Sequence, residues 1–170
     1  MNVLEKCNWL IQPSTKDVDT LADVAFGVAV QIAGEEANMS IVWKYKIDLV
    51  DENVFSEIEK SREIKIPDEM KKLIIEGNAA TPEKYNFMVG DTERVLGAIL
   101  SFNKNENDTD TVYTALEIIS DKNLLPFAID PFGNYICLAM DFDEIVFWNH
   151  ETGNTTSTGK KLNAFLEILY

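Results

Sequence analysis

Few residues of this 170-residue chain are suited to catalysis or metal binding. His150 is the only histidine, and it could act as a general base if a partner side chain and a pocket surrounded it. Asp141, Asp143 and Glu144 precede it closely and carry the oxygen ligands that a hard cation prefers. Cys137 is the remaining candidate, as a nucleophile. Whether each candidate can act in catalysis or metal binding depends on the element that positions it.

The candidates lie in one strongly patterned stretch, Leu124 to Glu151, which predicts three strands joined by two short turns. Its apolar runs are rich in Ile, Val, Phe, Tyr and Trp, and they barely alternate with polar residues. We therefore expect central strands that are covered on both faces. In this setting Cys137 is a buried thiol, without the electropositive and partly open site of a reactive cysteine. His150 is then a polar residue at the end of a strand.

Residues 141–144 are better explained as a hairpin turn than as a cation site, because an EF-hand loop needs about 12 residues with ligands at fixed positions. The sequence contains no glycine-rich phosphate loop, no zinc-ligand spacing and no nucleophile elbow. It thus predicts no catalytic residue, no metal site and no cofactor. An enzyme is the least favoured of the functions that we consider.

The rest of the chain alternates between amphipathic and polar segments. Met70, Leu73 and Ile74 share one face of a helix that starts near Pro67. Gly77 and Asn78 are expected to end this helix in the left-handed conformation. Together the elements predict one α/β domain in which helices precede and follow an antiparallel sheet. The other expected elements are helices over 16–33, 51–63, 111–119 and 162–169, strands over 40–47, 85–89 and 96–102, a polar turn over 90–94, and polar loops over 103–110 and 152–159.

The formal net charge of −14 at pH 7 is the clearest global property of the chain. It argues against binding to nucleic acids and to anionic membranes, because both need a positive protein surface. No apolar run reaches the roughly 18 residues of a membrane span, and the first residues do not resemble a secretory signal, so we expect a cytoplasmic protein. The acidic surface is either simply solvated or complementary to a basic partner.

Several segments follow one another in a characteristic order. The clearest are LPFAID at 125–130, FGNYICL at 132–138 and IVFWNHE at 145–151, preceded by IPDEMKKLI at 66–74 and EGN at 76–78 and followed by NAFLE at 163–167. Over residues 50–170 this order resembles the SUKH superfamily, which includes bacterial immunity proteins and the yeast cell-wall-assembly regulators of the Smi/Knr type. The chain departs from that family at Ala79-Ala80, where members often carry two glycines. It also departs after the ICL run, which in members is commonly followed directly by an aspartate, whereas here Ala139 and Met140 come before Asp141.

The resemblance implies an α/β (α+β) single domain with a curved, mainly antiparallel sheet packed against helices. The domain would span residues 50–170, with residues 1–49 as an N-terminal helical and strand addition. The resemblance also implies a protein without enzymatic activity that binds and neutralises a toxin, often a nuclease or a deaminase. A regulatory or scaffold module that binds an endogenous protein is the alternative.

A basic toxin would most readily meet exposed acids on loops, because their charges are complementary. Trp148 is a further candidate, as an aromatic anchor. The sequence leaves the oligomeric state open. The predicted partner-contact residues are therefore Asp91, Glu93, Asp108, Asp110, Asp141, Asp143, Glu144 and Trp148.

Overall fold

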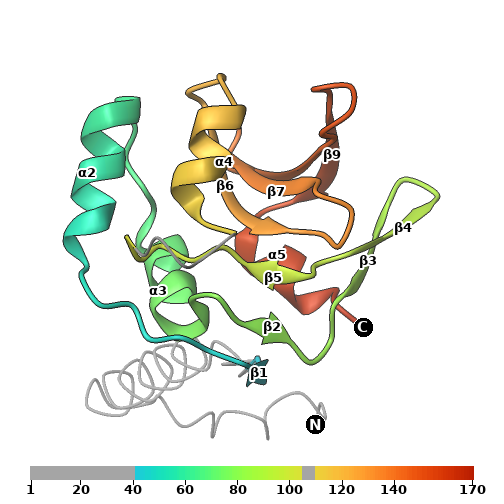
Figure 1. The fold of residues 1–170 in the computed structure, drawn as a ribbon. Helices are drawn as coiled ribbons and strands as arrows, with labels where there is room; N and C mark the ends of the chain where they lie inside the picture. The colour runs from blue at the N-terminus through green and yellow to red at the C-terminus, as the bar shows by residue number, and fades with distance from the viewer. Residues whose placement is uncertain (1–40, 105–109) are drawn as a thin grey trace, which may run out of the picture. The chain divides into compact units, whose positions relative to one another are not determined.

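A five-stranded antiparallel sheet is the largest sheet of the described residues, 41–104 and 110–170, in the computed structural model (Figure 1). These residues belong to one compact unit, Ile41–Tyr170. The predicted α+β class, with an antiparallel sheet and helices packed against it, is confirmed. The strands follow the order of the sequence: β5 (Ala98–Ile99), β6 (Leu124–Ile129), β7 (Tyr135–Ala139), β8 (Glu144–Trp148) and β9 (Thr155–Lys160).

Strand β7 is buried on both faces, as its unbroken apolar run predicts. None of its five residues is more than 6% exposed. Successive side chains of a strand point to opposite faces, so Tyr135, Cys137 and Ala139 lie on one face of the sheet and Ile136 and Leu138 on the other. Each face therefore needs a layer of its own to exclude water.

Three helices supply much of these layers. α4 (Val112–Ile118) packs against β6, and Figure 1 shows it in front of β6 and β7. α5 (Leu162–Glu167) packs against β8 and β9 and also contacts α3 (Asp68–Gly77). Leu138 of β7 meets side chains of α3 and α5 around one hollow, so these two helices lie on the Leu138 face. The α3 side chains that were predicted to share a face are buried together: Met70, Leu73 and Ile74.

Two polar segments form strands where a turn and a loop were expected. Thr92–Val95 is strand β4, which pairs with β3 (Asn86–Val89) in a hairpin that turns at Gly90 and Asp91. Thr155–Lys160 is β9, which pairs along one edge with β8. Both predictions were wrong for the same reason. These strands lack a regular apolar alternation, and the backbone pairing that defines them comes from a neighbouring strand.

The segment that precedes α2 (Asn53–Arg62) is held against the domain. The strand expected over 40–47 is reduced to β1 (Trp43–Lys44), which pairs with β2 (Thr81–Pro82). Residues 41–49, expected as part of the N-terminal addition, lie in the same compact unit as the rest of the described chain. The helix expected over 16–33 lies outside the described residues.

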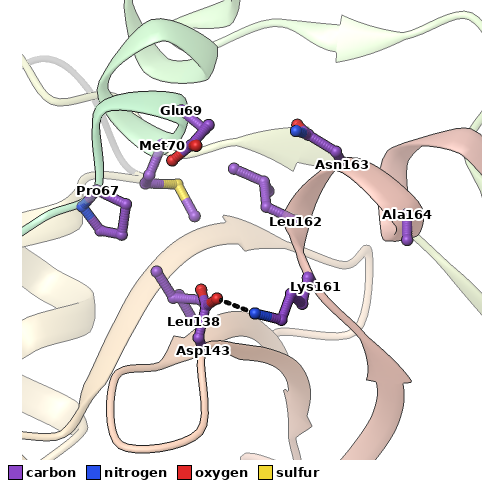
Figure 2. Close-up of a pocket in the computed structure, with 9 residues that line it drawn as sticks. All are labelled: Pro67, Glu69, Met70, Leu138, Asp143, Lys161, Leu162, Asn163 and Ala164. Atoms are coloured by element: carbon purple, nitrogen blue, oxygen red, sulfur yellow. Dashed lines mark hydrogen bonds and ion pairs between the residues drawn. The ribbon is translucent and has the colours of Figure 1, made fainter. Parts of the chain in front are cut away.

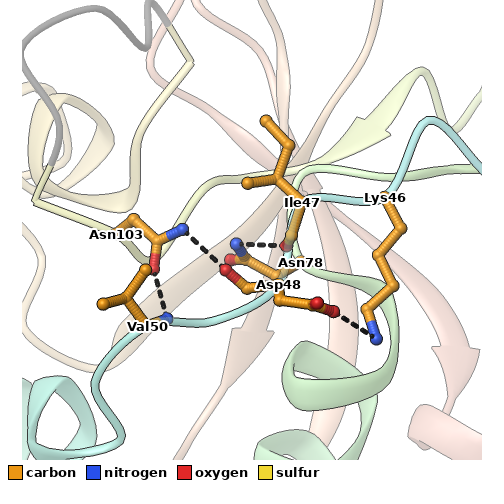
Figure 3. Close-up of polar contacts among 6 residues, drawn as sticks. All are labelled: Lys46, Ile47, Asp48, Val50, Asn78 and Asn103. Carbon is orange, nitrogen blue, oxygen red and sulfur yellow. Dashed lines mark hydrogen bonds and ion pairs between the residues drawn. The ribbon is translucent and has the colours of Figure 1, made fainter.

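Asn78 joins three parts of the chain through one buried side chain (Figure 3). Its Nδ2 donates a hydrogen bond to the carbonyl of Ile47 at 2.9 Å, and its Oδ1 accepts one from the backbone N–H of Phe102 at 2.8 Å. Its own carbonyl accepts a further bond from the N–H of Ile47 at 3.1 Å. An amide suits this position because it both donates and accepts, so the carbonyl of Ile47 and the buried N–H of Phe102 are both paired.

Asn103 holds the same segment slightly further along (Figure 3). Its Nδ2 donates to the carbonyl of Asp48 at 3.0 Å, and its Oδ1 accepts from the N–H of Val50 at 2.9 Å. Asn103 was expected to begin a solvated polar loop, but its side chain is only 8% exposed. The two asparagines together replace the backbone pairing that an extended β1 would have provided.

The end of α3 differs from the prediction. Asn78 has a φ of −54°, and the residue in the left-handed region is Ala79, with a φ of 58°. Gly77 is still helical, and its role is to leave space for the ring of Trp43. A Cβ added there would come within 2.8 Å of Cε2 and Cζ2 of Trp43, so the Trp43 ring can lie on the helix only because Gly77 has no side chain.

We expect Gly77→Ala to lower the free energy of unfolding by about 1 to 2 kcal/mol, because overpacking against Trp43 outweighs the better helix propensity of alanine. In a Trp43→Ala background the same substitution should be neutral or stabilising by up to about 1 kcal/mol. Urea denaturation of the four proteins of this double-mutant cycle measures the coupling. A loss of equal size in both backgrounds would contradict the clearance role.

Ala79→Gly should raise the free energy of unfolding by about 0.5 to 1 kcal/mol, because glycine adopts a positive φ without the strain that alanine incurs, and this exceeds its entropic cost in the unfolded chain. Ala164→Gly is the matched control. This residue lies within α5, where the substitution should cost about 1 kcal/mol. Thermal and urea melts give both values, and two losses of similar size would refute the strain at Ala79.

Candidate functional site

His150 belongs to a hydrogen-bonded brace rather than to a catalytic pair. Its Nδ1 lies 3.0 Å from Oδ1 of Asn134, and its backbone N–H donates to the same oxygen at 3.1 Å. The Nδ2 of Asn134 donates to Oδ2 of the buried Asp130 at 2.7 Å. Because this contact fixes the Asn134 oxygen as the acceptor, the proton of the neutral imidazole lies on Nδ1. The brace ties the end of β8 to the turn between β6 and β7.

Asp130 is the fixed end of this brace. Its Oδ1 accepts hydrogen bonds from the backbone N–H groups of Phe132 and Asn134, both at 2.8 Å. Three donors therefore satisfy one buried carboxylate, which is what a turn-forming aspartate requires. The chain of contacts ends at the exposed imidazole and contains no nucleophile.

Cys137 is not placed as a nucleophile. Its side chain is fully buried in β7, and burial raises the pKa of its thiol well above the ordinary value, although Arg62 partly opposes this rise. A thiol in this state is protonated at neutral pH and inert. Among the residues that the structure describes, no group of three or more His, Cys, Asp or Glu side chains could hold a metal ion.

A hollow of about 290 Å³ opens where the first turns of α3 and α5 meet the turn between β7 and β8 (Figure 2). Asp143 and Lys161 form an ion pair of 2.7 Å at its side. No serine, cysteine or histidine lines it, and its lysine, Lys161, is held in the ion pair with Asp143. The lining residues are Pro67, Glu69, Met70, Leu138, Asp143, Lys161, Leu162, Asn163 and Ala164.

Two of the predicted contact acids instead stabilise the fold next to this hollow. Glu144 accepts hydrogen bonds from the hydroxyl of Ser157 and, at 2.7 Å, from the backbone N–H of Gly159, so it fastens the start of β8 to β9. Asp143, in the β7–β8 turn, accepts a hydrogen bond from Lys161, the residue that follows β9. Asp141 is exposed in the same turn.

The other predicted acids lie on separate elements. Asp91 and Glu93 are exposed on the β3–β4 hairpin, and Asp110 is exposed just before α4. Glu93 accepts a hydrogen bond of 2.9 Å from the hydroxyl of Tyr170. Asp108 lies outside the described residues. The acids of the hairpin, of the β7–β8 turn and of the segment before α4 thus do not converge on one pocket.

Trp148 is buried in β8, where it is 9% exposed and its ring centroid lies 5.8 Å from that of Tyr135. It therefore offers almost no surface to a partner, and we leave it out of the contact set. Sequence reasoning missed the apolar side chains that are exposed, which include Met88, Phe142 and Tyr170. The exposure of Met88 could have been predicted, because side chains alternate along a strand and the neighbouring Phe87 and Val89 are buried.

Residues 49–168 match the sequence model of the SMI1/KNR4 family (SUKH-1). No curated protein matches the chain. Within residues 41–104 and 110–170, no helix has the length and apolar character to cross a membrane.

If the brace is structural, Asn134→Ala should cost about 1 to 3 kcal/mol of unfolding free energy, because it removes a partner of the buried Asp130 carboxylate and the acceptor of the His150 N–H. His150→Ala should cost less than about 1 kcal/mol, since it removes one bond from an exposed ring. Chemical denaturation of both variants gives the comparison. Equal losses would show that the imidazole, rather than the amide, holds the brace.

Proposed function

The chain belongs to the SMI1/KNR4 family (SUKH-1), and from this premise we propose that it is an immunity protein that binds and neutralises a cognate protein toxin. The toxin would be a nuclease or deaminase domain that acts in the cytoplasm. The proposed mechanism is steric and electrostatic, in that the bound protein covers the active site of the toxin. No reaction of its own is needed.

Family membership carries this proposal, and the net charge of −14 supports it. An enzyme that acts on nucleic acid holds phosphates in a positively charged cleft. Carboxylates on the immunity protein can occupy the same positive field. Complementary charge also accelerates association, which matters when the free toxin is lethal.

The described residues are consistent with a binding protein. The candidates for chemistry are used by the fold, because His150 braces a turn and Cys137 is buried. Four of the predicted contact acids are exposed and take part in no described ion pair, so they are available for a partner: Asp91, Glu93, Asp110 and Asp141.

The test is co-expression with the toxin domain encoded by the adjacent gene. We expect growth to be restored and a stable complex to elute in size-exclusion chromatography. The association rate should fall by about 10-fold or more as the salt concentration rises from about 50 mM to about 300 mM, because screening removes the steering between opposite charges.

An unrelated nuclease toxin is the control, and it should neither bind nor be neutralised. Continued killing by the adjacent toxin, together with the absence of a complex, would contradict the proposal. In that case the regulatory or scaffold function is the better explanation of the family membership.

A further inference from the structure

The outer face of the β3–β4 hairpin has no role in the core. Phe87 and Val89 point inward and are 0% and 6% exposed, whereas Met88 between them is 42% exposed. Met88 is paired across the hairpin with Glu93, so both side chains lie on the outer face. A long apolar side chain and a carboxylate thus stand next to each other in solvent.

The inner face fixes the hairpin in place. The ring of Phe87 meets that of Phe165 of α5 edge to face, with 5.0 Å between centroids. The guanidinium of Arg94, the only basic group of residues 86–95, lies 4.5 Å from the centroid of the buried Phe147 ring. The basic charge of the hairpin is therefore turned toward the sheet, while Asp91 and Glu93 remain outside.

Tyr170 extends the outer face. Its backbone exchanges two hydrogen bonds of 3.1 Å with that of Asn86 on β3, and its hydroxyl donates to Glu93 on β4. The side chain therefore crosses the hairpin from one strand to the other, and it stays 55% exposed. This hydrogen bond raises the pKa of Tyr170, so the hydroxyl remains a donor and holds the carboxylate in one orientation.

Three side chains therefore make up this outer face. We define the hairpin patch as Met88, Glu93 and Tyr170. Tyrosine and methionine are enriched in the cores of protein interfaces. A carboxylate that is already oriented loses less conformational freedom when it pairs with a cation.

We propose that the hairpin patch is the surface that contacts the partner, and that it receives a cationic protein surface in which an arginine or lysine pairs with Glu93 beside apolar contacts to Met88 and Tyr170. This inference rests on the proposed function and specifies where the toxin binds. A second copy of the chain is disfavoured as the occupant, because the patch has a carboxylate and no basic group to pair with it in a two-fold interface, since Arg94 is turned toward Phe147.

The test measures binding of the purified toxin domain from the adjacent gene by titration calorimetry at low salt. Glu93→Lys should weaken binding by about 100-fold and Met88→Ala by about 10-fold, whereas Tyr170→Phe, which keeps the ring and loses the hydroxyl, should weaken it by about 3-fold. Phe132→Ala and Glu151→Lys are matched controls, since they change an aromatic and an acid that are exposed elsewhere, and they should stay within about 2-fold.

Thermal melts of every variant test folding, and Glu93→Gln replaces Glu93→Lys if the reversal lowers the melting temperature. If the wild type binds and the hairpin variants bind equally well while Asp141→Lys weakens binding, this inference is wrong and the proposed function stands. If the wild-type protein does not bind the toxin domain, both this inference and the proposed function are wrong. Light scattering that shows a dimer dissociated by Glu93→Lys or Met88→Ala would identify a second copy as the occupant and overturn the proposal.

Discussion

The burial of β7 on both faces is the constraint from which the rest of the fold follows. A strand with five buried residues needs cover on two sides and paired neighbours along both edges. The chain supplies α4 over β6, and it supplies α3, α5 and the β3–β4 hairpin on the face of Leu138 and Phe147. The centre of the sheet is consequently closed to ligands, and binding has to occur at the covering elements and the turns.

This constraint also explains what the sequence could predict. Strands β6 to β8 and the buried face of α3 follow from runs of apolar side chains, which record burial directly. Strands β4 and β9 do not, because they are held by pairing with a neighbour that the local sequence does not reveal. Gly77 was correctly placed near a helix end but for the wrong reason. Its lack of a side chain is required by Trp43, a residue of the distant strand β1.

The predicted contact acids also show that the local sequence does not reveal long-range partners. Exposure of an acid can be predicted from a polar, turn-like segment, but its partners cannot. Asp143 and Glu144 are held by Lys161, Ser157 and Gly159, residues that lie 13 to 18 positions away in sequence. Tyr170 lies 77 positions from the carboxylate that it orients. Such pairings are decided when β9 and α5 return to the sheet, so only the folded chain distinguishes acids that stabilise the fold from acids that remain available.

The acids thus divide into two groups with different physical roles. Asp143 and Glu144 fasten the edge strand β9, whose six residues are almost all exposed and contribute little hydrophobic stabilisation. Those of the hairpin fasten nothing in the core, because Phe87 and Arg94 anchor the hairpin from its inner side. A substitution on the outer face therefore alters the charge and shape offered to a partner while the contacts that hold the hairpin are kept. A fold arranged in this way can change its partner without losing its core.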